Sequence, residues 1–337
     1  MKKVLLAPMM FALAVPSLLG QMPICNRCAR AACSPPTTTE TFALSDGEQV
    51  PLKWDVYLPN DGVWPPPWPV VVLIHAGGFA GGTRDDSQIK CAGHDLADAG
   101  FAAVSIDYRL DRNHLTGQTH DAFYPPSAPW DQISDVQKAI RAARHPAAGS
   151  ALYGNVNCKV GAIGGSAGGA HALWWAAAGT PGDDKLDAAV LLSGNYVLDD
   201  SASLTDSHYP NYCPNMKTYC TVPPEASCNS LSGNNKLQIG SPAYQVTSSV
   251  APLFLIDCVN DGGTPVNQKI LLNDRLNFLQ VTHDCAQVGP EKRANNCNHA
   301  FQYWCDSTVT CDTGTFKGYV NELSLEFLGL YLKGICP

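Results

Sequence analysis

The sequence has 337 residues, of which 45% are hydrophobic and 15% are charged. This composition excludes a disordered or fibrous protein, and the length is sufficient for one large α/β domain or two smaller domains. The formal net charge is −8 and no Lys/Arg-rich run occurs, which argues against nucleic acid or an anionic membrane as a partner. The 14 cysteines are many for a cytosolic enzyme of this size and raise the question of compartment.

Residues 1–20 have the pattern of a secretory signal peptide. Lys2 and Lys3 precede an apolar stretch, Val4 to Leu19, that is short for a membrane span. Cleavage near Gly20 would give a secreted or periplasmic protein, and an uncleaved N-terminal anchor is the alternative. No later stretch is long and apolar enough to cross a bilayer, so we expect no stable membrane insertion.

Residues 21–39 form a Cys-containing leader with Cys25, Cys28 and Cys33. The C-x-x-C spacing also occurs in zinc and redox sites, but no second pair at a fitting distance and no preceding strand accompany it. We therefore expect structural disulfides and no metal. The even number of cysteines allows up to seven bridges, whose pairing the sequence does not determine.

Residues 40–337 are predicted to form a single α/β domain. Glu40 to Leu58 alternates around Ser45-Asp46-Gly47, which predicts an antiparallel hairpin. Beyond Pro69, strands alternate with helices, which indicates a mostly parallel sheet with helices on both faces. The expected strands are Val70–Ile74, Phe101–Ile106, Lys159–Ile163, Ala188–Leu192 and Pro252–Ile256. The expected helices are Gln88–Ala97, Gln132–Arg144, Gly168–Ala178, Pro265–Gln280 and about Lys317–Leu332.

A Cys-rich insertion at about residues 197–244 interrupts this alternation. It is rich in Ser, Asn and Pro and contains Cys213, Cys220 and Cys228. Its length predicts an excursion over the edge of the sheet, as a lid or a wall of a binding site.

Gly164-Gly165-Ser166-Ala167-Gly168 lies directly between a predicted strand and a predicted helix. This is the context of a G-x-S-x-G nucleophile elbow, in which a sharp turn exposes the serine at the N-terminus of the helix. We therefore predict that Ser166 is a catalytic nucleophile. A serine needs a base, and the base needs an acid to orient it, in the chain order Ser, Asp/Glu, His.

Asp261 is the predicted acid because it lies in the loop after the strand Pro252–Ile256, at the end where such sheets place functional groups. Asp257 is the rival, at the end of the strand itself. Four histidines follow the nucleophile: His171 on its helix, His208 before the acid, His283 after what reads as the next strand, and His299. His299 is the predicted base because it lies in a loop before the last helix.

His75-Ala76-Gly77-Gly78-Phe79 follows the first buried strand. Consecutive glycines allow the backbone to turn its N–H groups toward a substrate. We predict that Gly77 and Gly78, with the N–H of Ala167, form an oxyanion hole and that Phe79 contacts the substrate. His75 is expected to hold the loop by hydrogen bonds.

Through these residues the sequence resembles the α/β-hydrolase superfamily. It is most similar to bacterial carboxylesterases of the feruloyl/acetyl-xylan esterase and hormone-sensitive-lipase-like type. The likeness covers residues 40–335, and Asp261 and His299 fall where the acid and base of the family would fall. The matching motifs are Asp55–Pro59, His75–Phe79, Asp107–Leu110 and Gly164–Gly169.

Two features bear on this resemblance. Ala76 replaces the first glycine of the family's His-Gly-Gly-Gly motif but leaves both donor positions intact. The N-terminal cap of the hormone-sensitive-lipase relatives is missing, which favours the feruloyl/acetyl-xylan side.

Asp107 and Arg109 are expected to form a structural pair. Cys258 and Cys297 lie so close to the acid and the base in sequence that we expect a disulfide between them to clamp the two loops.

The resemblance implies a secreted serine carboxylic-ester hydrolase that acts through an acyl-enzyme, without metal or organic cofactor. Acetyl, feruloyl or other short-chain esters are the expected substrates, and a lipase or polyester hydrolase of the same fold is the alternative. A peptidase fits less well because no accessory domain is present. A catalytically inactive hydrolase used for adhesion is the alternative from another class, against which the complete Ser/Asp/His set argues.

Overall fold

The computed structural model describes residues 35–47, 49–110, 129–258, 261–288, 299–305, 308–309 and 318–334. The predicted signal peptide, residues 1–20, and most of the leader lie outside these ranges. Within them, no helix has the length and apolar character needed to cross a membrane.

The described residues form one nine-stranded sheet in the order β1-β2-β4-β3-β5-β6-β7-β8-β9. From β4 through β3 to β8, neighbouring strands are parallel, whereas β1, β2 and β9 are joined to the sheet by antiparallel pairing. The strands are β1 (Thr38–Leu44), β2 (Pro51–Tyr57), β3 (Trp68–Ile74), β4 (Ala102–Ile106), β5 (Val156–Gly165), β6 (Ala188–Leu192), β7 (Leu253–Cys258), β8 (His283–Val288) and β9 (Thr308–Val309).

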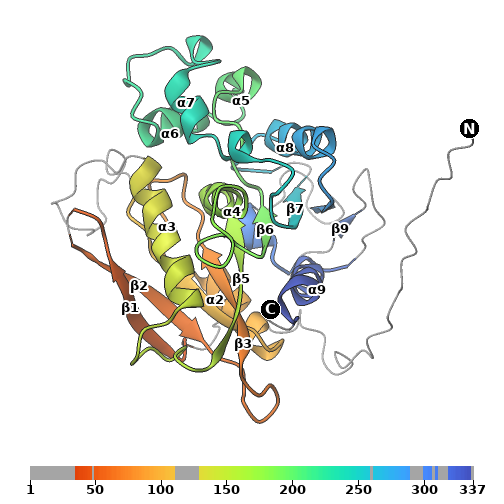
Figure 1. Cartoon of the computed structure of the whole chain (residues 1–337). Helices are drawn as coiled ribbons and strands as arrows, with labels where there is room; N and C mark the ends of the chain where they lie inside the picture. The colour runs from red at the N-terminus through yellow and green to blue at the C-terminus, as the bar shows by residue number, and fades with distance from the viewer. Residues whose placement is uncertain are drawn as a thin grey trace, which may run out of the picture.

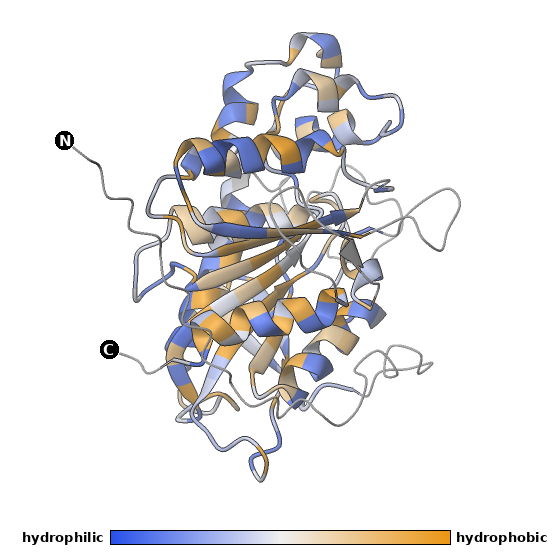
Figure 2. Cartoon of the chain, turned by 90° about the vertical axis from the view of Figure 1, so that its right-hand side faces the viewer, coloured by the Kyte–Doolittle hydropathy of each residue, from blue (hydrophilic) through white to orange (hydrophobic). Residues whose placement is uncertain are grey.

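Helices cover both faces of the sheet (Figures 1 and 2). In β3, Val70 and Val72 pack into one hydrophobic cluster while Val71 and Leu73 pack into the other, because successive side chains of a strand point to opposite faces. Helices α3, α4 and α8 contribute to the first cluster, and α2 and α9 to the second. Their bounds are α2 (Ser87–Asp98), α3 (Pro129–Arg144), α4 (Ala167–Ala177), α8 (Asn267–Phe278) and α9 (Val320–Leu332).

The predicted fold class, the hairpin and the predicted strands and helices are confirmed, with ends that differ by a few residues. Strand β8, with the sequence HDCAQV, is not among the five strand ranges expected from the sequence, because its polar residues do not form an apolar run. His283 was expected to follow a strand, but it is the first residue of β8. The structure corrects that placement.

The insertion, residues 197–244, folds into short helices that lie together near α8 (Figure 1). Although polar on average, it buries a hydrophobic cluster that it shares with Phe79, Ala167 and Ala170, and a disulfide joins Cys213 to Cys228. Cys220 is a buried free thiol. The helices are α5 (Ser201–Thr205), α6 (Tyr212–Tyr219), η2 (Cys228–Ser230), α7 (Asn235–Gly240) and η3 (Pro242–Gln245).

Candidate active site

Ser166 lies on a strained turn between β5 and α4. Its φ and ψ are 52° and −114°, and a positive φ is costly for a residue with a Cβ, by about 1–3 kcal/mol. The surroundings hold this conformation, since the backbone N–H of Ser166 donates to the carbonyl of Leu192 at 2.8 Å. Only 4% of Ser166 is exposed, so the turn presents the serine within a nearly closed site.

The glycines of the elbow are required by close approaches of the backbone. A Cβ at Gly164 would lie 2.1 Å from the carbonyl oxygen of Gly168, and a Cβ at Gly168 would lie 2.1 Å from that of Ile74. Both distances are far inside van der Waals contact, so no side chain fits at either position. The glycines therefore bring the start of α4 against the end of β3, where the predicted oxyanion loop, His75–Phe79, begins.

Asp261 and His299 are hydrogen-bonded, with 2.7 Å between the carboxylate Oδ1 and the imidazole Nδ1. The same oxygen accepts the backbone N–H groups of Gly263 at 2.7 Å and Thr264 at 2.8 Å. Burial alone would raise the pKa of Asp261, but the hydrogen bond and attraction of His299 outweigh it and lower that pKa. An ionised Asp261 accepts a hydrogen bond from the Nδ1–H of His299, and in that tautomer Nε2 carries a free lone pair, as the predicted base requires.

The base loop also packs against the elbow. His299 precedes the short helix η4 (Ala300–Tyr303), and a Cβ at Gly165 would lie 2.9 Å from the Cβ of Ala300. A Cβ at Gly263 would lie 2.7 Å from the imidazole Nε2. The structure thus gathers the nucleophile, acid and base expected from the sequence at one end of the sheet.

Asp257, the rival acid, faces a different partner. Its Oδ1 accepts a hydrogen bond from Lys269 Nζ of α8 at 2.8 Å, and burial raises its pKa. Its hydrogen bond to Lys269 directs it toward α8, whereas Asp261 holds His299.

The remaining histidines have partners of their own. His171 is buried and 3.1 Å from the side chain of Gln132, and burial, with repulsion from another histidine, lowers its pKa to about 3. His283 lies 2.9 Å from the side chain of Asn273. His208 is exposed at the surface of the insertion. No hydrogen bond between the described residues joins any of the three to the acid.

The loop after β3 offers free backbone donors. Gly77 and Gly78 have φ of 138° and 60°, and neither is buried. Within the described residues, the N–H groups of Gly77, Gly78 and Ala167 make no hydrogen bond. The loop is closed by the carbonyl of Gly77, which accepts from Ala80 at 3.1 Å and Gly81 at 2.9 Å. Unpaired donors beside a serine suit an oxyanion hole, since they cost nothing to reorganise during the reaction.

His75 braces this loop, as expected. Its Nδ1 is 2.7 Å from the carbonyl of Ala76, and its ring stacks on Tyr108 with centroids 4.2 Å apart. The hydroxyl of Tyr108 donates to the carbonyl of His75 at 3.0 Å. Because His75 and Tyr108 are both buried, these contacts hold the loop against the core.

Phe79 has no exposed surface. Its ring stacks on Tyr219 of the insertion, with centroids 3.8 Å apart, and its carbonyl accepts a hydrogen bond from Gln132 at 2.8 Å. In this arrangement the ring ties the insertion to the oxyanion loop. A direct contact with substrate, as predicted from the sequence, would require Tyr219 or the loop to move.

Asp107 and Arg109 are both ion-paired, but not with each other, which corrects the expectation. Asp107 pairs with Arg84. Arg109 forms a two-pronged pair with Asp135 of α3, at 2.7 and 2.8 Å, and the side chains are 7% and 0% exposed. Asp107 therefore links the loop after β4 to Arg84, whereas Arg109 links the same loop to α3.

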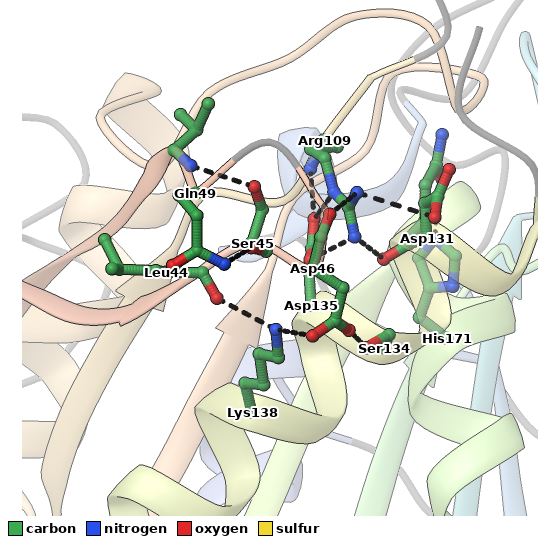
Figure 3. A network of polar contacts seen from close by, with 12 residues as sticks. Leu44, Ser45, Asp46, Gln49, Arg109, Asp131, Ser134, Asp135, Lys138 and His171 are labelled. Atoms are coloured by element: carbon green, nitrogen blue, oxygen red, sulfur yellow. Dashed lines mark hydrogen bonds and ion pairs between the residues drawn. The ribbon is translucent and has the colours of Figure 1, made fainter. Parts of the chain in front are cut away.

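The pair of Arg109 belongs to a network that joins the hairpin turn to α3 (Figure 3). Arg109 Nη1 donates to the carbonyl of Asp46 at 3.1 Å, and Lys138 Nζ pairs with the Asp46 carboxylate at 2.6 Å. On the same helix, Gln132 contacts both the oxyanion loop and His171 of α4. Through Gln132, helix α3 thus holds the predicted oxyanion loop in a fixed position relative to α4.

Most cysteines in the described part of the chain are oxidised. Cys258, at the end of β7, is disulfide-bonded. Cys297, its expected partner in the clamp, lies outside the described residues, so this pairing stays a prediction.

A family model described as BD-FAE matches residues 54–276, more than half of the chain. No curated protein matches. Among solved structures, esterase 2 of Thermogutta terrifontis phosphonylated by sarin has a TM-score of 0.60 at 19% identity, over 88% of this chain and 96% of that chain. Its butyrate-bound form has a TM-score of 0.58 at 19% identity, over 89% and 96%. A truncated carbohydrate esterase from gut microbiota has a TM-score of 0.54 at 17% identity, over 76% and 90%. At these identities the likeness shows a shared fold.

Proposed function

The chain belongs to the BD-FAE family and has the α/β-hydrolase fold, and from this premise we propose that it is a serine carboxylic-ester hydrolase with Ser166, His299 and Asp261 as its triad. The observation that carries the proposal is the 2.7 Å hydrogen bond between His299 and Asp261, beside a serine held at positive φ. Nucleophile, base and orienting acid are the three parts that acyl transfer by a serine requires.

In the proposed reaction, His299 Nε2 takes the proton of the Ser166 hydroxyl as Oγ attacks the ester carbonyl. The N–H groups of Gly77, Gly78 and Ala167 bind the oxyanion of the tetrahedral intermediate. The imidazolium then donates its proton to the leaving alcohol, and an acyl-enzyme remains. Water attacks this ester with His299 again as base, which releases the acid and restores the serine. Asp261 stays ionised and stabilises the imidazolium.

For the substrate, we propose short-chain esters such as acetyl or feruloyl esters. Support comes from the solved structures with this fold, one of which is a butyrate-bound esterase and another a carbohydrate esterase. The proposed chemistry uses protein groups alone, without a metal or organic cofactor. Secretion is part of the proposal, and it is supported by the pattern of residues 1–20 and by the oxidised cysteines, including the Cys213–Cys228 bridge.

The test compares the wild-type protein with Ser166→Ala on acetyl, feruloyl and longer acyl esters. The control substrate is the amide analogue of the acetyl ester. We expect Ser166→Ala to lower kcat for the esters by several orders of magnitude, about 10³ or more, without changing the fold. Unchanged turnover in Ser166→Ala would refute the assignment of the nucleophile. A preference for long acyl chains would refute the proposed substrate class.

A further inference from the structure

The insertion contacts both halves of the proposed active site. On one side, Tyr219 of α6 stacks on Phe79 of the oxyanion loop. On the other, the hydroxyl of Tyr209 donates to the backbone carbonyl of Asp261 at 2.9 Å. Its hydrophobic cluster also includes Ala167 at the start of α4. Side chains between these contacts are therefore held at fixed positions close to the reacting serine.

Asn215 of α6 is such a side chain. A Cβ at Gly78 would lie 2.6 Å from Asn215 Nδ2, so the carboxamide lies against the oxyanion loop at one of the proposed donor positions. The backbone of Asn215 is helical, donating to the carbonyl of Asn211 at 3.0 Å. The bridge at Cys213, two residues earlier, ties this helix to the rest of the insertion.

The carboxamide of Asn215 has unused hydrogen-bonding capacity. In the part of the chain that the structure describes, it makes no side-chain hydrogen bond, and the residue is only partly buried. Two other polar side chains that contact these loops are engaged: Tyr209 with the carbonyl of Asp261, and Gln132 with that of Phe79. A partly accessible, unpaired carboxamide beside the donors for an oxyanion is placed to bind a polar atom of the substrate.

We propose that Asn215 is a specificity-determining residue that binds a free hydroxyl next to the scissile ester. A carboxamide carries two donors and an acceptor, and a hydroxyl both accepts and donates, so the two are complementary. The substrate class is accordingly an ester of a polyhydroxylated alcohol, such as a partly acylated sugar, with a hydroxyl neighbouring the acyl group. This inference rests on the proposed esterase function and narrows its alcohol component.

The test uses two substrates that differ only at the hydroxyls. One is a methyl pyranoside with a single acetyl group and free neighbouring hydroxyls, and the other is the same acetyl ester with those hydroxyls methylated. The variants are Asn215→Leu and Asn215→Ala, and the matched control is Asn229→Leu, at an exposed asparagine of the same insertion. The measurement is the ratio of kcat/KM for the two substrates, which cancels any general loss of active protein.

We expect the wild-type protein and Asn229→Leu to favour the hydroxylated ester, and both Asn215 variants to lower that ratio by about five- to tenfold, the effect of one hydrogen bond. An unchanged ratio in both Asn215 variants would overturn the role of Asn215 while leaving the esterase function intact. If the wild-type protein hydrolyses simple acetyl esters but neither pyranoside, the inference fails and the esterase function stands, whereas hydrolysis of no ester at all would overturn the esterase function and this inference with it.

Discussion

Replacing Asp261 by Asn isolates the charge of the proposed acid from its shape. The carboxylate Oδ1 accepts three hydrogen bonds, from His299, Gly263 and Thr264, and an amide oxygen can still accept the two from the backbone. The loop should therefore persist, while the negative charge beside the imidazole is lost. With unit charges 2.7 Å apart and an effective dielectric constant near 20, the attraction for an imidazolium is about 6 kcal/mol.

Because about 1.4 kcal/mol corresponds to a tenfold change in rate, we expect Asp261→Asn to lower kcat for a short-chain ester by about 10⁴-fold. The matched control is Asp257→Asn, four residues earlier, whose carboxylate pairs with Lys269. It should lose stability, because a lysine side chain that is only 14% exposed is left without its partner, and keep most of its kcat per folded molecule. Steady-state kinetics with active-site titration give kcat per folded molecule for both variants. Equal losses of kcat in the two variants would refute the assignment of the acid.

Two further predictions concern stability. Arg109→Met should lower the free energy of unfolding by about 3–5 kcal/mol, because Asp135, with no exposed surface, loses its counter-ion, whereas Lys90→Met, at an exposed pair, should cost less than about 1 kcal/mol. Urea unfolding measures both, and similar costs would contradict the role of the buried pair. Burial, aided by repulsion from His75, lowers the pKa of His171 to about 3, so below pH ~6.5 the unfolded chain binds a proton that the folded chain refuses. Stability should therefore decrease by up to about 1.4 kcal/mol per pH unit as the pH falls from about 6.5 toward 3, and His171→Gln should remove that part of the slope. If the stability of His171→Gln depended on pH as steeply as that of the wild-type protein, His171 would not be the source of this pH dependence.

The features that the sequence predicts well are those encoded in contiguous residues. Ala188–Leu192 is a strand with the expected ends, because a parallel sheet buried on both faces needs an uninterrupted apolar run. The elbow around Ser166 is predictable for a similar reason, since the close approaches of Gly164 to Gly168 and of Gly168 to Ile74 exclude side chains at both glycines.

The features that the sequence does not predict depend on contacts between distant segments. Strand β8 is polar, and its burial depends on neighbouring elements rather than on its composition. Asp107 and Arg109 lie close in sequence, yet their partners, Arg84 and Asp135, come from other elements. Asn215 reaches Gly78 only because the insertion folds back over the oxyanion loop. No spacing or motif in the sequence predicts that contact.

The proposed mechanism depends above all on Ser166 as the nucleophile of an acyl-transfer reaction. The most direct measurement is to treat the folded protein with a fluorophosphonate probe and locate the adduct by peptide mass spectrometry. We expect one adduct per chain, on the peptide that contains Ser166, and its loss in Ser166→Ala. Absence of an adduct from the wild-type protein, or an adduct on another residue that persists in Ser166→Ala, would contradict it.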